Sequence, residues 1–290
     1  MDKFETNRRH LLTALASAIV GAVLSKPAVS EILKSAQQPN PKTFETGDIV
    51  WPKPPGVFVP YAGTAADRMI VQAQELQEEE WNELRIQFIR AARADTPDVD
   101  PEKLAYQRKV ADIVETMPYT RFFHEYTANV KPDDFQTYGI GQIAYVGHVA
   151  IIEVDAATKI PYVIEAVFGP SLTCKSCVQR VTYADWLKAR GDILVWHGRV
   201  RNVDAGKRAA IATEAKQQLN KPYRFFNFDL LDDSGFYCSK LLWYSVLKAT
   251  GIALDGNPDS RRFIWFSPLQ AMQSKSSVEL LSSPGNYRNI

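Results

Sequence analysis

Hydrophobic spacing in the C-terminal third of the chain predicts a buried helix that follows a turn. Apolar residues recur at helical spacing from Cys238 to about residue 250, and Gly251 ends the segment. The turn-forming run 232–235 precedes it. A cysteine in the first turn of a helix lies at the positive end of the helix dipole, which stabilises a thiolate, and Lys240 would add positive charge in that turn. Cys238 is therefore a candidate nucleophile; the alternative is a small buried apolar residue.

Two stretches of alternating or continuous apolar residues, 143–154 and 161–167, predict a β-hairpin. The first carries His148 at its start, and the second carries Glu165 within an apolar run. A buried carboxylate needs a partner, and a histidine on the adjoining strand can provide one. Glu153 is the rival carboxylate, but it lies five positions from His148 and should face the other side of the strand. Glu165 is therefore the preferred partner.

The middle of the chain predicts a helical block between two strand regions. A strand follows the Gly47-Asp48 turn and is expected to end at Pro52. Helical spacing then covers about 64–94, and a second helix runs from Pro101 to about residue 117. We therefore assign a helical insertion at about 62–118 and hypothesise that it is a lid over a cleft.

The N-terminus predicts an export signal rather than part of the fold. An Arg8-Arg9 pair precedes an apolar run at 11–24, and residues 28–30 form a small-x-small cleavage site. This pattern resembles a twin-arginine signal, so the expected transient partner is the twin-arginine translocation machinery. Residues 1–30 are assigned as the signal and 31–45 as a linker, with a periplasmic or cell-envelope location. An uncleaved anchor and a frayed helix are the alternatives.

Length and charge narrow the class of protein. The 290 residues have a net charge of +1, with Lys and Arg spread along the chain. No basic run with interleaved aromatic residues is present, so no nucleic-acid partner is expected. The length suits one domain, at 46–290, that contains the helical insertion; two domains are the alternative.

The number of cysteines predicts which of them are paired and which is free. An exported chain with three cysteines has one possible pair and one cysteine left over. We expect a local disulfide between Cys174 and Cys177, which leaves Cys238 as the free thiol. A zinc site is the alternative, but its remaining ligands would have to come from His124 and His197. A thioredoxin-like redox site lacks the strand–CxxC–helix unit. No metal or cofactor is expected.

Three stretches together resemble a known family. G-H-V-A-I-I-E at 147–153 resembles the catalytic-histidine strand of NlpC-type papain-like cysteine hydrolases. K-P-Y-R-F-F with G-F-Y-C-S-K-L, within 221–241, resembles their nucleophile region, and G-D-I-V-W at 47–51 resembles their Gly-Asp strand. The nucleophile comes last here, so the order is a circular permutation similar to the YiiX/YebB-like branch. The resemblance implies an α+β, circularly permuted papain-like fold with an antiparallel sheet packed on the nucleophile helix.

The resemblance also implies a role for each site residue. Cys238 matches the nucleophile, His148 its base, and Glu165 the residue that orients the imidazole. Tyr223 matches a tyrosine that lies near the substrate and helps to hold the oxyanion. Tyr237 stands where cell-wall peptidases carry Asp, so their substrate specificity does not transfer.

The expected function is an exported thiol hydrolase that cleaves an amide or ester bond through an acyl-enzyme. The expected substrate is a peptidoglycan peptide or a lipid-type amide or ester. The alternative is a catalytically silent module that binds a cell-envelope ligand on the same scaffold.

Overall fold

A computed structural model describes residues 38–55, 82–83, 85–94, 100–116, 147–169, 171–262 and 265–287. The predicted export signal lies outside these residues. The strands are β1 (Ile49–Lys53), β2 (Ala150–Val154), β3 (Pro161–Ala166), β4 (Val178–Thr182), β5 (Leu194–Val200) and β6 (Val278–Ser282). The helices are the 3-10 helix η1 (Pro41–Thr43), α4 (Pro101–Glu115), α7 (Tyr183–Arg190), α8 (Ala205–Lys216), α9 (Cys238–Thr250) and α10 (Pro268–Gln273). Residues 85–93 are also helical.

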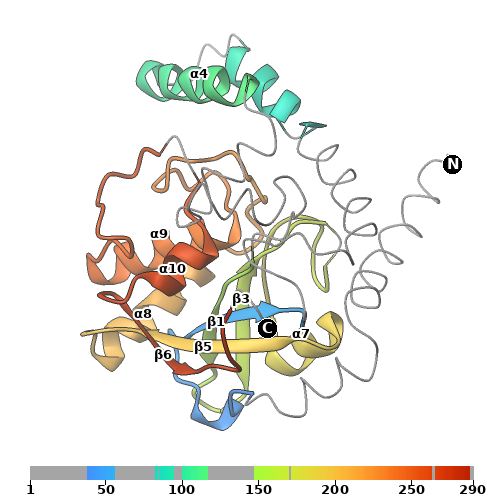
Figure 1. The fold of residues 1–290 in the computed structure, drawn as a ribbon, viewed down its shortest axis with the longest axis vertical. Helices are drawn as coiled ribbons and strands as arrows, with labels where there is room; N and C mark the ends of the chain where they lie inside the picture. The colour runs from blue at the N-terminus through green and yellow to red at the C-terminus, as the bar shows by residue number, and fades with distance from the viewer. Residues whose placement is uncertain are drawn as a thin grey trace, which may run out of the picture.

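The six strands form one antiparallel sheet in the order β4-β3-β2-β1-β5-β6. The predicted hairpin is confirmed, because β2 pairs with β3 in the register Ile151 to Ile164. The first described strand, β1, lies between β2 and β5, so segments far apart in the sequence meet at the centre of the sheet (Figure 1).

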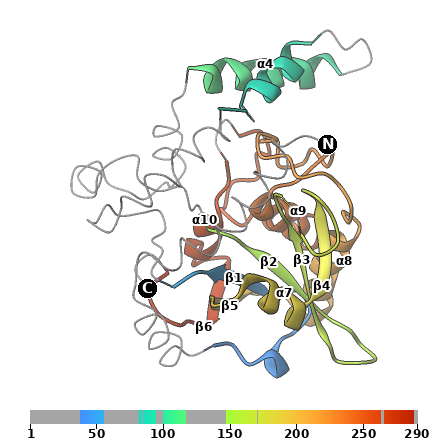
Figure 2. The same ribbon diagram turned by 90° about the vertical axis from the view of Figure 1, so that its right-hand side faces the viewer.

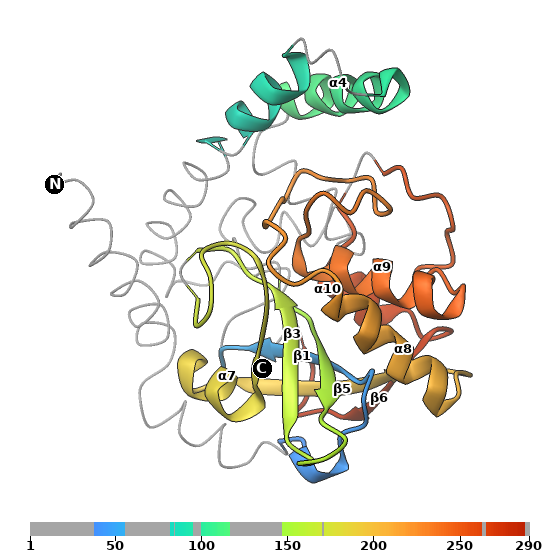
Figure 3. The ribbon, with the colours of Figure 1, turned by 180° about the vertical axis from the view of Figure 1, so that it is seen from behind.

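Side-chain alternation divides the core into two apolar layers. On β3, Ile164 joins the larger cluster with residues of α8 and α9, whereas Val163 joins a second cluster with Trp186 of α7. Figure 3 shows α8 and α9 side by side along the sheet, and Figure 2 shows α7 near the opposite surface. The predicted sheet packed on the helix that begins at Cys238 is therefore confirmed.

Two expected strand boundaries are wrong. The first strand does not end before Pro52, because Pro52 pairs with Val195 of β5 and the strand continues to Lys53. A proline fits there because the pairing of β1 with β2 covers only Ile49 and Val50, so its missing N–H faces no neighbouring strand. The His148 strand begins at Ala150, two residues after the histidine; residues 143–146 lie outside the described part of the chain.

The described part of the expected insertion is helical and lies at one end of the molecule (Figure 1). Helix α4 contacts the segment before α9 through an ion pair of 2.9 Å between Lys103 and Asp232. Phe88, from the preceding helical stretch, stacks on Phe226 with 5.5 Å between ring centroids. Of the helices that the structure describes, none has the length and apolar character needed to cross a membrane.

Candidate active site

The candidate nucleophile is the first residue of α9. Cys238 is buried, with 6% of its surface exposed, and the helix ends at Gly251 in the left-handed conformation. Tyr237 precedes it with extended backbone and makes no side-chain cap. The N–H groups of the first turn therefore receive no partner from the N-cap side chain.

Backbone pairing joins the two halves of the predicted nucleophile region. Phe236 N–H donates to Pro222 O at 3.0 Å, and Arg224 N–H donates to Phe236 O at 3.0 Å. The segments approach so closely at Gly235 that a Cβ there would lie 2.9 Å from Pro222 O. The Gly235 position thus brings the Pro-Tyr segment alongside the residues that lead into Cys238.

His148 lies between the other two members of the candidate triad. Its Nε2 is 2.7 Å from Glu165 Oε2, and Cys238 lies close enough to raise the pKa of the ring. The preceding Gly147 has φ of +81°, and a Cβ on it would lie 2.5 Å from the Tyr287 hydroxyl. This close approach requires glycine, so Gly147 and Tyr287 fix the backbone that carries His148.

Glu165 is fully buried and accepts four hydrogen bonds. Besides His148, the donors are the side chains of Gln179 (2.8 Å), Trp186 (2.8 Å) and Arg190 (2.7 Å). Burial by itself raises the pKa of this carboxyl, but the charge of Arg190 and the donated hydrogen bonds lower it to about 2. The carboxylate is therefore ionised throughout the neutral range.

The charge of the imidazole follows from its neighbours. Burial lowers the pKa of His148, but attraction to Cys238, the hydrogen bond with Cys238 and the contact with Glu165 together raise it to about 9. At neutral pH the ring is an imidazolium between two groups that carry or can carry negative charge. This arrangement can support a thiolate–imidazolium pair.

Sheet geometry explains why these residues meet. Extending the β2–β3 register by one residue places Glu165 opposite Ala150, so His148 is its diagonal neighbour on the same face. That face is covered by α7, which supplies Trp186 and Arg190, whereas Cys238 begins the helix on the other face. His148 precedes the first residue of β2 and therefore reaches both groups at the end of the strand.

The contacts bring Cys238, His148 and Glu165 together, and they place Tyr223 beside the nucleophile segment by a backbone bridge to Phe236. The Tyr223 ring lies 5.5 Å from the Phe168 ring, centroid to centroid. The rival carboxylate, Glu153, pairs instead with Arg180 and Lys216 on the protein surface.

Sequence reasoning missed the other three partners of Glu165. Gln179 lies directly opposite Glu165 on β4, and nothing in the local pattern of this mixed polar and apolar strand distinguishes it. Trp186 and Arg190 lie on α7, where nothing in the local pattern distinguishes them from other helical residues.

Two further expectations concern the cysteines and metals. Cys174 and Cys177 are joined by a disulfide, which leaves Cys238 as the free thiol among the cysteines. A zinc site on that pair is not compatible with this bond. Within the ranges that the structure describes, no group of three or more His, Cys, Asp or Glu side chains is arranged to hold a metal ion.

The expected role of Lys240 as a source of positive charge needs correction. Its side chain is completely buried, and Nζ donates to Asn227 O at 3.2 Å. Burial lowers the pKa of this lysine to about 7, although Asp232 and Asp229 oppose the effect. The ammonium is therefore only partly charged at neutral pH, and it contacts the loop before α9.

Two comparisons with known proteins found similar proteins. A family model described as permuted papain-like amidase enzyme, YaeF/YiiX, C92 family, matches residues 120–280. The crystal structure of metalloprotein yiiX from Escherichia coli O157:H7 is a neighbour at 20% sequence identity. That match covers 47% of this chain and 82% of that chain, with a TM-score of 0.35. None of the curated proteins matches the chain.

Proposed function

Because the chain belongs to the family of permuted papain-like amidases of the YaeF/YiiX type, we propose that it is an exported thiol hydrolase with Cys238 as its nucleophile. Membership supports hydrolase chemistry on a permuted papain-like α+β fold. Our proposal adds to family membership the roles of the site residues, the acyl-enzyme, the substrate and the cellular location.

One observation carries the proposal: the His148 ring contacts Glu165 at 2.7 Å and lies close enough to Cys238 for the two groups to interact electrostatically. A buried structural cysteine needs no such partner. An imidazole with a raised pKa beside a thiol at a helix N-terminus is the arrangement that activates a thiolate. The buried Glu165 carboxylate holds the imidazole in position, as the third member of a triad does.

The reaction proceeds in two halves. The Cys238 thiolate attacks the carbonyl carbon of the scissile bond and forms an S–C bond, while the carbonyl π electrons move to oxygen. Backbone N–H groups of the first turn of α9, with Tyr223, stabilise this oxyanion. When the oxyanion collapses, the bond to the leaving nitrogen or oxygen breaks, and the leaving group takes the proton of His148.

The second half restores the enzyme. Neutral His148 accepts a proton from water, and the resulting hydroxide attacks the thioester carbonyl. Collapse of that intermediate releases the carboxylic acid product and returns the thiolate and the imidazolium. Glu165 stays ionised throughout, because its low pKa keeps it a hydrogen-bond acceptor.

The proposed substrate is an amide or ester of the cell envelope, either a peptidoglycan peptide or a lipid-type compound. Exposed Phe168 beside Tyr223 supplies an apolar surface near the nucleophile segment. The Cys174–Cys177 disulfide suits an oxidising compartment and so supports export. Fractionation of cells that produce the full chain tests the location; protein confined to the cytoplasm would contradict export.

Iodoacetamide labelling tests the nucleophile without knowledge of the substrate. Without reductant the native protein has Cys238 as its free thiol, and the same protein in denaturant is the reference for an unperturbed thiol. We expect native Cys238 at pH 7 to react at least about tenfold faster than the reference, and His148→Gln to remove the difference. Slow labelling that is indifferent to His148 would contradict the proposal.

Mass spectrometry then addresses the substrate. Wild-type protein and Cys238→Ala are incubated separately with peptidoglycan fragments and with a lipid extract. An acyl adduct on Cys238, present only in the wild type, identifies the substrate class by its mass. Fast labelling without any adduct or Cys238-dependent product in either extract would contradict both substrate classes and leave the activated thiol unaffected.

A further inference from the structure

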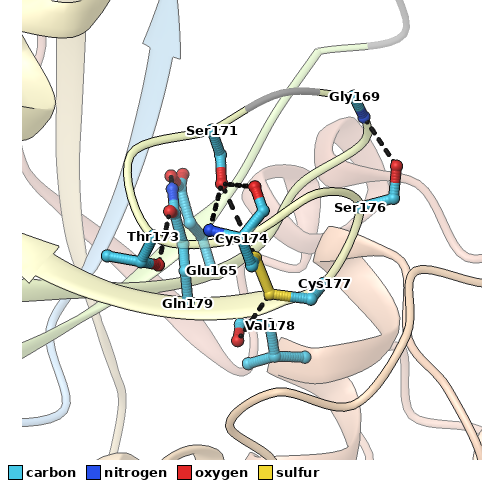
Figure 4. Close-up of a disulfide and its surroundings, with 9 residues drawn as sticks. All are labelled: Glu165, Gly169, Ser171, Thr173, Cys174, Ser176, Cys177, Val178 and Gln179. Atoms are coloured by element: carbon cyan, nitrogen blue, oxygen red, sulfur yellow. Dashed lines mark hydrogen bonds between the residues drawn. A yellow bond between two sulfur atoms is a disulfide. The ribbon is translucent and has the colours of Figure 1, made fainter.

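The loop between β3 and β4 is closed on itself beside Glu165 (Figure 4). Its disulfide joins Cys174 to Cys177, with 6.1 Å between the Cα atoms. Ser171 Oγ donates to Cys174 O at 2.6 Å, and Gly169 N–H donates to Ser176 Oγ at 2.9 Å. The described residues of this loop, 167–169 and 171–177, are therefore joined by covalent and hydrogen bonds within it.

A directed chain of hydrogen bonds leads from this loop to the candidate triad. Thr173 Oγ1 donates to Gln179 Oε1 at 3.1 Å, and Gln179 Nε2 donates to Glu165 Oε1 at 2.8 Å (Figure 4). The chemistry of the carboxylate determines which way the Gln179 amide is oriented. A carboxylate only accepts, so the amide nitrogen of Gln179 must face Glu165, and its amide oxygen is left for the threonine hydroxyl.

The two oxygens of Glu165 are thereby assigned to different partners. Gln179 binds Oε1, whereas His148, Trp186 and Arg190 bind Oε2. Rotation of the carboxylate would break the contact with Gln179. The amide therefore fixes the plane of the carboxylate, and with it the oxygen that meets the imidazole.

The same loop also holds the other side of the site. Tyr223 N–H donates to Ser176 O at 2.8 Å, and Cys177 forms a β-bridge with Pro222. One closed loop is thus connected to Glu165 through Gln179 and to the Pro-Tyr segment through its backbone.

We propose that Gln179 is a positioning residue for the His148–Glu165 pair and that the disulfide-closed loop holds it in place through Thr173. The inference rests on the proposed roles of Cys238, His148 and Glu165. Gln179 contacts neither the nucleophile nor the reacting atoms, so it acts through Glu165.

Positioning has a signature that distinguishes it from an electrostatic effect. If Gln179 only competes with His148 for the carboxylate charge, its removal strengthens the remaining bond and raises the pKa of His148. If Gln179 orients the carboxylate, its removal lets Oε2 turn away, and the pKa of His148 falls from its value of about 9. The sign of the change therefore decides between the two.

The experiment compares Gln179→Met, which keeps the length of the side chain but removes its hydrogen bonds, with the wild type. Gln217→Met, at an exposed position after α8, is the matched control. NMR follows the titration of the His148 ring, and iodoacetamide labelling at pH 7 follows Cys238. We expect the proton affinity of His148 to fall about three- to tenfold and the labelling to slow by a similar factor in Gln179→Met alone.

The role of the loop is tested by combining variants. Cys174→Ala with Cys177→Ala should slow labelling in the wild-type background and lose most of this effect in Gln179→Met, because the connection from the loop to Glu165 runs through Gln179. The part of the effect that remains reports the backbone connection of the loop to Tyr223. Full additivity of the two effects would overturn the proposed connection through the loop.

The possible outcomes separate this inference from the proposed function. A raised or unchanged pKa of His148 in Gln179→Met overturns the positioning role while wild-type Cys238 still labels rapidly. Slow labelling of wild-type Cys238 would instead contradict the proposed function itself. An equal response of Gln217→Met would also overturn the inference, because the effect would then not depend on the contact with Glu165.

Discussion

At the residue scale, ionisation in the candidate site is decided by neighbours rather than by residue type. Glu165 is fully buried, which by itself favours the neutral acid, yet Arg190 and three further donors stabilise its charge. The ionised carboxylate and Cys238 then stabilise the His148 imidazolium against the opposing effect of burial. The charge of Glu165 thus depends on Arg190, and the charge of His148 depends on Glu165 and Cys238.

The raised pKa of His148 makes the stability of the folded protein depend on pH. The pKa of His148 is about 9 in the folded protein and 6.5 in the unfolded chain. Protonation of His148 therefore adds to the free energy of unfolding, fully below pH 6.5, and this contribution is lost as the pH rises through about 9. We expect the NMR titration of the His148 ring to have its midpoint near pH 9 and to move to lower pH in Glu165→Gln. A midpoint near 6.5 in the wild type would contradict the charge arrangement.

Gly147 offers a second test at this scale. Gly147→Ala combines a left-handed backbone with a Cβ placed 2.5 Å from the Tyr287 hydroxyl. We expect the free energy of unfolding to fall by about 2 kcal/mol or more and the labelling of Cys238 to slow, because His148 is the next residue.

The control for Gly147→Ala is Gly251→Ala, which has a similar φ of +77° but no atom within 4 Å of the added Cβ. We expect Gly251→Ala to lower the free energy of unfolding by about 1 kcal/mol and to leave the labelling of Cys238 unchanged. Equal losses in denaturant unfolding of the two variants would show that the contact with Tyr287 is unimportant.

At the scale of the element, α9 begins with the candidate nucleophile and is buried throughout its first two turns. Ser239 Oγ donates to Phe266 O at 2.5 Å, and Lys240 contacts Asn227 O, so the residues that follow Cys238 are held by the loops on either side. The helix start is thus fixed by polar contacts that face away from solvent. Lys240 makes this element sensitive to pH.

Lys240 keeps its proton up to pH 10.5 in the unfolded chain but only to about pH 7 in the folded protein. Between these values the unfolded state binds more protons, so the free energy of unfolding rises with pH. We expect the stability of the wild type, relative to Lys240→Met, to increase by about 1 kcal/mol per pH unit between about pH 7.5 and 9.5.

Urea unfolding of both proteins at several pH values measures the Lys240 effect. Lys53 is also buried with a lowered pKa, but it is present in both proteins and cancels in the comparison. Parallel stability curves for the two proteins would contradict a shifted pKa for Lys240.

At the scale of the whole molecule, the described helices of the expected insertion contact the segment that leads to Cys238. The Lys103–Asp232 ion pair and the Phe88–Phe226 stack join it to residues 226–232, and the Tyr106 hydroxyl donates to Arg262 O beyond α9. These contacts are the basis for a test of the hypothesis that the insertion acts as a lid.

A charge reversal tests the lid. We expect Lys103→Glu, which opposes Asp232, to speed the labelling of Cys238 by a bulky maleimide about two- to fivefold and to leave labelling by small iodoacetamide unchanged, because repulsion at an ion pair of this kind is worth about 1 kcal/mol. Lys109→Glu makes the same charge change at an exposed position of α4 and is the control. Equal maleimide rates in all three proteins would contradict the lid hypothesis.

The sequence alone determined the local features of this protein. The turn and helical spacing before Gly251 located α9 and put Cys238 at its start, and the apolar strands located the hairpin with His148 and Glu165. These features depend on backbone periodicity, turns and pairing between neighbouring strands, all of which act over short separations. Errors stayed at boundaries, at Pro52 and Ala150, where pairing with distant strands decides the last residue.

Only the tertiary structure decided the environment of those residues. Arg190 and Trp186 reach Glu165 from α7, and Tyr287 packs against Gly147 from the far end of the chain. Burial likewise changed Lys240 from an expected source of charge into a lysine with a pKa of about 7. The local sequence pattern shows which side chains an element carries. The charge and pKa of each side chain depend on the groups that surround it in space, and long-range packing determines which groups those are.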